Sequence, residues 1–270
     1  MVIDIDSSFL LSRLDIEFFR ANGFVKLAQV LSAETLAYYG SSITRLTLEL
    51  NRQAAPMEER STYDRAFLQV MNLWQHNVRV REFVLGKRLA RIAAELLEVG
   101  GVRLYHDQSL YKEPGGGITP AHADQYYWPL ASDRTVTAWI PLQAVPREMG
   151  PLAFYAGSQS VEIGRELPIC DDSERLITAN MSTSGFLMVD EPFDLGEVSL
   201  HLGWTFHRAG PNRSSRPRSV MTIIYMDHAM RLKAPVNEMQ RNDWDTWCPG
   251  AVPGELIDTP LNPLVYVAGA

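Results

Sequence analysis

The stretch GVRLYHDQSLYKEPGGGITPAH, residues 101–122, marks the point at which the chain changes character. Its first half is rich in β-branched, aromatic and aliphatic residues, and Pro114-Gly-Gly-Gly117 then interrupts it, as expected where a strand ends in a turn. Further short β-rich runs, separated by Gly and Pro, follow at 135–142, 152–155, 185–189, 198–206 and 219–226. Many short strands in succession are typical of a double sheet of the jelly-roll or cupin type.

The residues before Gly101 have a helical pattern instead. Ser32 is a suitable N-cap for a helix that continues to Leu50, with apolar residues at three- and four-residue steps. A second helix is predicted near 80–99, with Gly100-Gly101 as its stop. The polar residues 54–65 indicate a loop, and the last forty residues look irregular. We expect one domain over 1–270, with a mostly helical lead-in at 1–100, a β core at 101–228 and a C-terminal covering segment at 229–270. Its N-terminal helices should pack on one outer face of the sheets.

Charge and composition restrict the class of partner and the compartment. The formal net charge of -7 argues against a nucleic-acid partner, because phosphate-binding surfaces need clustered Lys and Arg. Two cysteines in so long a chain indicate reduced thiols rather than a disulfide framework. The N-terminus resembles no signal peptide, and no apolar run is long enough to span a membrane. We expect a cytoplasmic protein with a small-molecule substrate; nothing in the sequence marks an oligomeric interface.

The sequence contains six histidines, and one of them, in His122-Ala-Asp124, lies two positions from an acidic residue, which suggests a metal site. Side chains at i and i+2 of a strand point to the same face, so both can reach one ion. A third ligand must come from a distant strand, and His207, which lies at the end of a β-like run, is the candidate. Two imidazoles and one carboxylate on one side of an octahedral ion leave three positions open, as in non-haem Fe(II) oxygenases. Mn(II), Co(II) and Zn(II) suit the same donors.

Arg218 is the candidate for binding an acidic cosubstrate. It follows His207 by 11 residues, and a turn at 210–217 would return the chain as an adjacent antiparallel strand, with the guanidinium near the metal. A buried guanidinium requires a carboxylate partner, which a 2-oxo dicarboxylic acid chelating the metal would supply. The alternative is an ion pair with a protein acid such as Glu191.

Five groups of residues, taken in order, carry a more specific signal. They are Asp107-Gln-Ser-Leu-Tyr-Lys112-Glu-Pro-Gly, His122-Ala-Asp124, Thr137-Ala-Trp139-Ile-Pro-Leu142, Met149-Gly-Pro-Leu152 with Gly157-Ser-Gln159, and His207-Arg-Ala-Gly-Pro-Asn with Arg218. In this order the segments resemble the phytanoyl-CoA dioxygenase-like family over about half of the chain, from His106 to Met226. They depart from the family pattern at Gly157-Ser-Gln159, where the family usually has Gly-Ser-His.

The resemblance implies a mainly β fold with α, a double-stranded β-helix, that binds Fe(II) and uses 2-oxoglutarate and O2. It places the iron at His122, Asp124 and His207 and the distal carboxylate of 2-oxoglutarate at Arg218. Thr137, Trp139, Gln108 and Tyr111 match positions that contact the cosubstrate or substrate in members of the family. The intact carboxylate of Asp124 disfavours halogenation, because related halogenases have Gly or Ala there.

The implied activity is oxidation of a C–H bond in a small, apolar or polycyclic substrate of the kind found in secondary metabolism. Hydroxylation, epimerisation, desaturation and cyclisation are all open, each with release of succinate and CO2. Tyr127, Trp128 and Tyr225 are candidate walls for such a substrate, or else core aromatics. Two rival functions remain: a metal-dependent cupin enzyme that does not use 2-oxoglutarate, and a non-catalytic jelly-roll binding module.

Overall fold

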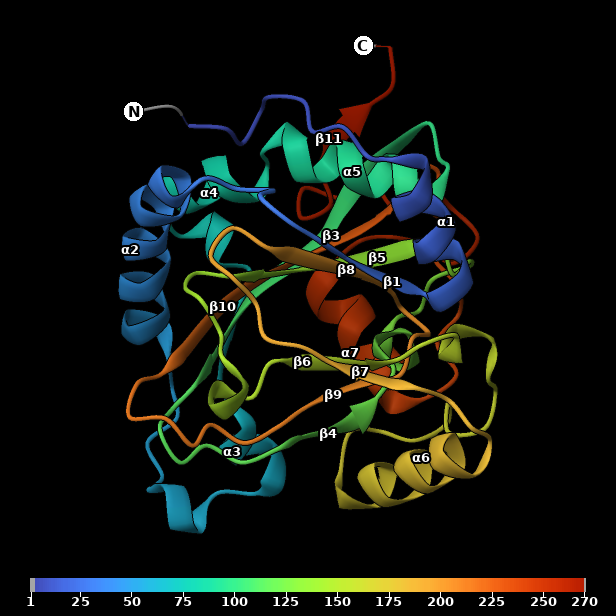
Figure 1. The fold of residues 1–270 in the computed structure, drawn as a ribbon. Helices are drawn as coiled ribbons and strands as arrows, with labels where there is room; N and C mark the ends of the chain where they lie inside the picture. The colour runs from blue at the N-terminus through green and yellow to red at the C-terminus, as the bar shows by residue number, and fades with distance from the viewer. Residues whose placement is uncertain (1–2, 270) are drawn as a thin grey trace.

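Two antiparallel sheets form the centre of the protein, which we describe from a computed structural model covering residues 3–269 (Figure 1). Sequence neighbours are often separated within each sheet, as expected for a jelly roll. The larger sheet has the order β1 (Phe24–Leu27), β8 (Val198–Leu202), β5 (Thr135–Pro141), β10 (Arg218–Asp227), β3 (Gly101–Lys112) and β11 (Leu264–Val267), with β2 (Leu68–Met71) also paired to β3. The smaller sheet has the order β4 (Thr119–His122), β9 (His207–Ala209), β6 (Leu152–Tyr155) and β7 (Met188–Asp190).

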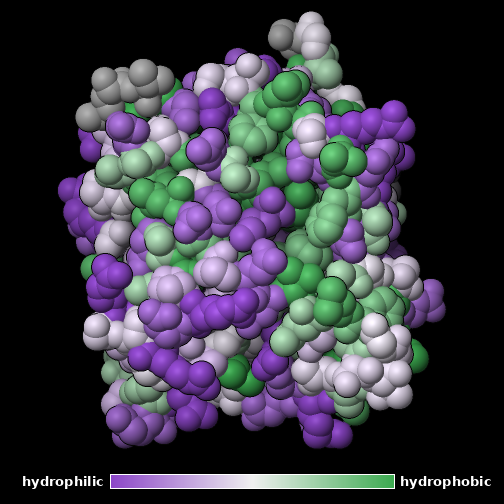
Figure 2. Space-filling model, viewed as in Figure 1, coloured by the Kyte–Doolittle hydropathy of each residue, from purple (hydrophilic) through white to green (hydrophobic). Residues whose placement is uncertain are grey.

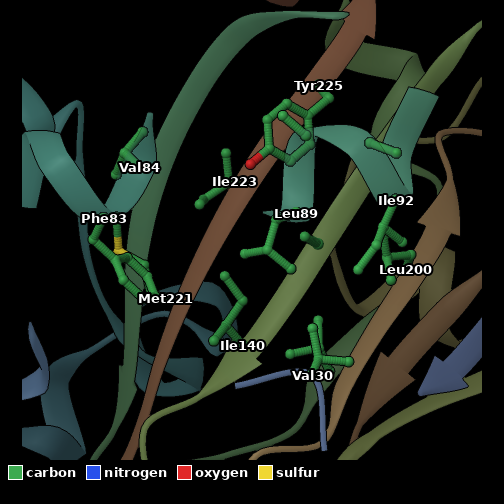
Figure 3. Packing of buried hydrophobic residues seen from close by; sticks show 14 of the residues in the cluster. Val30, Phe83, Val84, Leu89, Ile92, Ile140, Leu200, Met221, Ile223 and Tyr225 are labelled. Carbon is green, nitrogen blue, oxygen red and sulfur yellow. The ribbon is translucent and has the colours of Figure 1, made fainter. Parts of the chain in front are cut away.

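Helices cover the outer face of the larger sheet, as predicted. The buried cluster that joins helices and sheet draws apolar side chains from α2 (Ala33–Leu50), α4 (Val78–Val84) and α5 (Lys87–Leu97). The strands β5, β8 and β10 contribute alternate residues to it. Figure 3 shows Phe83, Leu89 and Ile92 from the helices meeting Ile223 and Leu200 from the strands. The other α-helices of the described residues are α1 (Arg13–Asn22), α3 (Thr62–Ala66), α6 (Asp171–Thr183) and α7 (Glu238–Trp247).

Alternation along the strands decides which side chains face the space between the sheets. In β10, Met221 and Ile223 point to the helices, while Arg218 and Thr222 lie on the other face. In β5, Ala138 packs toward the helices and Thr137 and Trp139 face inward. The polar side chains of the larger sheet's inner face therefore come together in the interior.

The helical lead-in follows the sequence prediction in part. Ser32 caps α2, and its hydroxyl accepts a hydrogen bond from the Thr35 N–H at 3.2 Å. The helix predicted near 80–99 is two helices, because the chain breaks at Gly86 and restarts as α5. α5 ends at Glu98, which adopts the left-handed conformation, so Gly100-Gly101 is not its cap. Residues 1–100 also contribute β1 and β2, which the prediction missed.

The C-terminal segment is more regular than expected, since it contains α7 and β11. Asn237 caps α7 by accepting from the Gln240 N–H at 2.8 Å. The Gln240 side chain in turn donates to the Tyr126 carbonyl at 3.1 Å, which fixes the helix beside the segment that follows Asp124. α7 therefore lies next to the predicted metal site.

Hydrophilic and hydrophobic residues are mixed over the face of the protein that Figure 2 shows. In residues 3–269 we find no helix with the length and apolar character of a membrane span. Cys170 and Cys248 are both free thiols, in agreement with the prediction of no disulfide framework.

Candidate metal centre and cosubstrate pocket

His122, Asp124 and His207 converge in the interior, each offering one ligand atom, and these atoms lie within 4.8 Å of one another. The Asp124 Oδ1 lies 3.5 Å from the His122 Nε2 and 3.6 Å from the His207 Nε2. The two histidines are paired across β4 and β9 of the smaller sheet. The two residues were expected on one strand, but β4 ends at His122, and Asp124 begins a short 3₁₀ helix, Asp124–Tyr127. The backbone of Ala123 stays extended, which keeps both side chains on one side.

Backbone carbonyls orient both imidazoles. The His122 Nδ1 lies 2.7 Å from the Pro120 carbonyl oxygen, and the His207 Nδ1 lies 2.9 Å from that of Thr205. Each carbonyl can only accept, so each Nδ1 carries the proton and each Nε2 keeps its lone pair toward Asp124. This is the tautomer that a metal-binding imidazole requires.

Two further side chains hold the other carboxylate oxygen of Asp124. The Thr137 hydroxyl donates to Oδ2 at 3.0 Å, and the His201 Nε2 lies 3.2 Å from the same oxygen. Thr137 and His201 face each other across β5 and β8. Oδ2 is thus engaged by the larger sheet, while Oδ1 is left facing His122 and His207.

The protonation states suit a divalent cation. Burial lowers the pKa of His207 well below its usual value, which keeps the imidazole neutral. Burial alone would raise the pKa of Asp124, but the neighbouring His207, His122 and His201 hold it well below its usual range. Metal ligands must be deprotonated, and both shifts favour the deprotonated form of these two side chains.

The spacing passes a simple test for one shared ion. Nitrogen and oxygen ligands bind such metals at about 2.1 Å, so two of them can lie at most about 4.2 Å apart. Both distances from the Asp124 Oδ1 are shorter than this limit. The donor set, two imidazoles and one carboxylate, is that of the facial triad of non-haem Fe(II) enzymes.

Arg218 lies across the interior from this cluster, completely buried and without an acidic partner among residues 3–269. Its Nη1 donates to the Gly150 carbonyl, its guanidinium lies 5.4 Å from the Trp139 ring centroid, and its Nε has no hydrogen-bond partner. Burial lowers its pKa to about 9. Glu191, the alternative partner in the sequence analysis, pairs with Lys26 at 3.4 Å instead. Because Nε has no partner, this side of the buried guanidinium can donate to the carboxylate of an incoming acid.

The route that brings Arg218 to the site differs from the prediction. β10 pairs with β3 and β5 and not with β9, so Arg218 is not on a strand adjacent to His207. The connection after His207 crosses from the smaller sheet to the larger one. Arg218 therefore faces the metal ligands from the opposite sheet.

A cavity of about 520 Å³ connects the cluster to Arg218 and to the C-terminal helix. Its walls include the predicted residues Thr137, Trp139, Gln108, Tyr127 and Trp128 together with all three candidate metal ligands. The Gln108 Oε1 accepts from the Gln69 side chain at 2.6 Å, and the Tyr127 hydroxyl accepts from the Ile169 N–H at 2.8 Å. Thr137 has the further role of holding Asp124.

Tyr111 and Tyr225 lie outside this cavity, and the two expectations for them are corrected. The Tyr111 hydroxyl is 2.8 Å from that of Thr44 on α2, on the outer face of the sheet. Tyr225 is fully buried among the helices that cover the sheet (Figure 3). In both cases strand alternation turns the side chain away from the inner face.

Several residues of the site were not recognised from the sequence. His201 lies in the run 198–206, which was recognised as a strand, and Thr137 was a candidate cosubstrate contact, but the pairing of their strands could not be predicted. Tyr63, Gln69 and Asp243 line the cavity from segments that were predicted to be a loop, a helical region and an irregular tail. The capping residue Asn237 was the one local signal for the helix that carries Asp243.

Comparisons with known proteins agree with this geometry. The family model described as Phytanoyl-CoA dioxygenase (PhyH) matches residues 19–220. The curated Phytanoyl-CoA dioxygenase domain-containing protein 1 of Danio rerio is 27% identical over 148 residues, which are 50% of this chain and 50% of that protein. The chain thus matches about half the length of this curated relative.

Solved structures resemble the chain over nearly its whole length. The non-heme alpha ketoglutarate dependent carbocyclase SnoK from nogalamycin biosynthesis has 25% identity and a TM-score of 0.77, with 95% of this chain and 97% of SnoK covered. The epimerase SnoN from the same biosynthesis has 23% identity and a TM-score of 0.76, with 94% and 98% covered. The likeness to SnoN supports the fold alone. These neighbours confirm the predicted mainly β fold of the cupin type.

Proposed function

Because the chain belongs to the phytanoyl-CoA dioxygenase family of Fe(II)- and 2-oxoglutarate-dependent enzymes, we propose that it oxidises a C–H bond of a small, largely apolar or polycyclic molecule. The observation that supports this most directly is the position of Arg218. Its unpaired, buried guanidinium faces the His122, Asp124 and His207 cluster across one cavity. A metal site without 2-oxoglutarate would leave that charge without a partner.

We assign each residue of the site a separate role in binding. His122, Asp124 and His207 would hold the iron, and Thr137 and His201 would keep the Asp124 carboxylate in place. Arg218 would bind the distal carboxylate of 2-oxoglutarate and so set the direction of its 2-oxo acid end. When bound, the iron supplies activation of O2 coupled to conversion of 2-oxoglutarate into succinate and CO2. The walls exclude water and orient the substrate C–H bond.

The shape and lining of the cavity support the substrate class. Tyr127, Trp128 and Trp247 present aromatic surface to a space of about 520 Å³, within the range of sites for drug-sized molecules. SnoN is described in complex with Fe3+, alpha ketoglutarate and nogalamycin RO. By analogy with SnoN, we propose that the substrate of this chain also resembles a natural product. The reaction is hydroxylation, epimerisation, desaturation or cyclisation. The two free thiols support a cytoplasmic location.

An anaerobic titration of the Fe(II)-loaded protein with 2-oxoglutarate tests the proposal. Chelation should produce a weak visible charge-transfer band, and His122→Ala or Asp124→Ala should abolish it. His76→Ala is the matched control, because His76 is exposed and is not among the residues that line the cavity. A folded, iron-loaded protein that gives no band would refute the use of 2-oxoglutarate and favour the cupin alternative.

Mass spectrometry of candidate substrates then identifies the reaction. A gain of one oxygen indicates hydroxylation, a loss of two hydrogens indicates desaturation or ring closure, and an unchanged mass with altered stereochemistry indicates epimerisation. Succinate formed in proportion to product is required in every case.

A further inference from the structure

We propose that Asp243 binds a protonated amino group of the substrate, at the end of the cavity opposite Arg218. This inference rests on the proposed function, since it concerns the substrate of the same site. It narrows the substrate class to an amine-bearing molecule.

The first support is the placement of Asp243. It lies on α7, lines the cavity, and its Oδ2 accepts a hydrogen bond from the Tyr105 hydroxyl at 3.0 Å. α7 is held beside the metal site by the bond from Gln240 to the Tyr126 carbonyl. Asp243 is therefore on a helix that is fixed beside the metal site, and it lines the same cavity as the metal ligands.

The second support is the absence of a protein counter-charge. Among residues 3–269, no Lys, Arg or His nitrogen lies within 4.0 Å of the Asp243 carboxylate. Arg218 is the single Lys or Arg side chain in the described lining of the cavity, and it is assigned to the cosubstrate. Burial raises the pKa of Asp243 to about 7, as expected for a carboxyl group that lacks a cation.

The third support is the charge balance of the loaded site. The two positive charges of Fe(II) and the one of Arg218 are cancelled by Asp124 and the two carboxylates of 2-oxoglutarate. Lys112 lies next to Arg218 in register, but it is outside the cavity, and burial lowers its pKa to about 6. When Asp243 is ionised, above its raised pKa of about 7, its charge has no partner in this balance, and a substrate cation would supply one.

The surroundings of Asp243 also favour an ammonium group. Trp247 lines the cavity one turn further along α7, and its ring lies 5.3 Å from that of His106. The buried His106 Nδ1 has no hydrogen-bond partner. An aromatic ring close to a carboxylate can stabilise an organic cation by cation–π attraction in addition to the ion pair. Asn242 and Thr246 complete this end with neutral polar groups.

Matched aromatic probes test the inference without knowledge of the natural substrate. Naphthylethylamine and naphthylethanol differ in the amino and hydroxyl groups, and their dissociation constants are measured calorimetrically at about pH 8, where amine and carboxylate are both charged. The anaerobic Fe(II)–2-oxoglutarate protein should bind the amine about tenfold or more tightly than the alcohol. Asp243→Asn should reduce this preference to about twofold or less, because the amide keeps an acceptor for Tyr105 but loses the charge.

Two further variants isolate the role of the charge. Asp245→Asn removes an exposed carboxylate from the same helix and should leave the preference unchanged. Tyr105→Phe removes the hydrogen bond to Asp243 but keeps its charge, so the preference should persist. Equal binding of the two probes by the wild type, or a preference that survives Asp243→Asn, would overturn the inference.

The charge-transfer band, recorded on the same samples, separates the two proposals. A normal band together with no amine preference refutes the role of Asp243 and leaves the oxygenase proposal standing. A missing band together with a preference that depends on Asp243 refutes the use of 2-oxoglutarate and supports the amine site.

Discussion

Replacement of Arg218 by Met is the most direct perturbation of the cosubstrate site. Methionine preserves much of the apolar stem of arginine but removes the guanidinium. In the protein, Nη1 is already engaged by the Gly150 carbonyl, while Nε has no partner, so the Nε and Nη2 side of the fork is free for a carboxylate. The three candidate metal ligands should be unaffected, since His122 and His207 lie on the other sheet and Asp124 follows in a 3₁₀ helix.

The magnitude follows from two charge-assisted hydrogen bonds formed in a buried site. Each contributes about 1.5–3 kcal/mol, so their loss should weaken 2-oxoglutarate binding by about 3–6 kcal/mol. This corresponds to an increase in the dissociation constant of roughly a hundredfold to ten-thousandfold. Iron binding should change little.

The assay is the anaerobic titration of the charge-transfer band, with Arg216→Met as the matched control. Arg216 is exposed, so its loss should leave 2-oxoglutarate binding within about twofold of the wild type. Circular dichroism should show that Arg218→Met keeps the fold. If folded Arg218→Met binds 2-oxoglutarate with the wild-type affinity, then Arg218 does not bind the cosubstrate and the reasoning fails.

Three other perturbations test the site and its supports. His201→Gln should weaken Fe(II) affinity about ten- to a hundredfold, because Asp124 loses a contact to Oδ2; exposed His76→Gln should not, and equal affinity in both variants would refute the positioning role. Gly150→Ala should lower the free energy of unfolding by more than about 2 kcal/mol, because its φ is +67° and the new methyl group would lie 2.2 Å from the Gly210 carbonyl oxygen. Gly185→Ala, with φ +75° and open space around it, should cost only about 1 kcal/mol; urea unfolding that gives equal losses would contradict the steric argument. Burial raises the pKa of Asp107 from 3.8 to about 7, so between these two pH values its carboxyl is protonated in the folded protein but ionised in the unfolded chain. The wild type should therefore lose stability from this group as pH rises from about 4 to 7, and Asp107→Asn should not, with a difference of up to about 4 kcal/mol in urea unfolding; parallel pH profiles would disprove it.

The metal ligands could be predicted because their geometry is mostly local. His122 and Asp124 are two residues apart in extended backbone, which places both side chains on one side whether or not the strand continues. The β character after Gly101 and the cap at Ser32 are local as well, since they depend on side-chain type and spacing over a few residues. The same strand alternation shows why two expectations were wrong. Tyr111 is three residues from Gln108 and Tyr225 is seven from Arg218, so odd spacing puts each on the opposite face from its neighbour in the site.

The sequence by itself determined the chemistry of the site: a His-x-Asp pair, a distant histidine, an arginine without an assigned acid, and a β core to hold them. Only the tertiary structure decided that Arg218 faces the metal ligands from the opposite sheet, that His201 and Thr137 share one oxygen of Asp124, and that Asp243 lines the same cavity. The physical reason is that strand pairing and helix docking depend on contacts between residues far apart in the chain. Spacing along the sequence reports which side chains share a face, but not which face lies opposite.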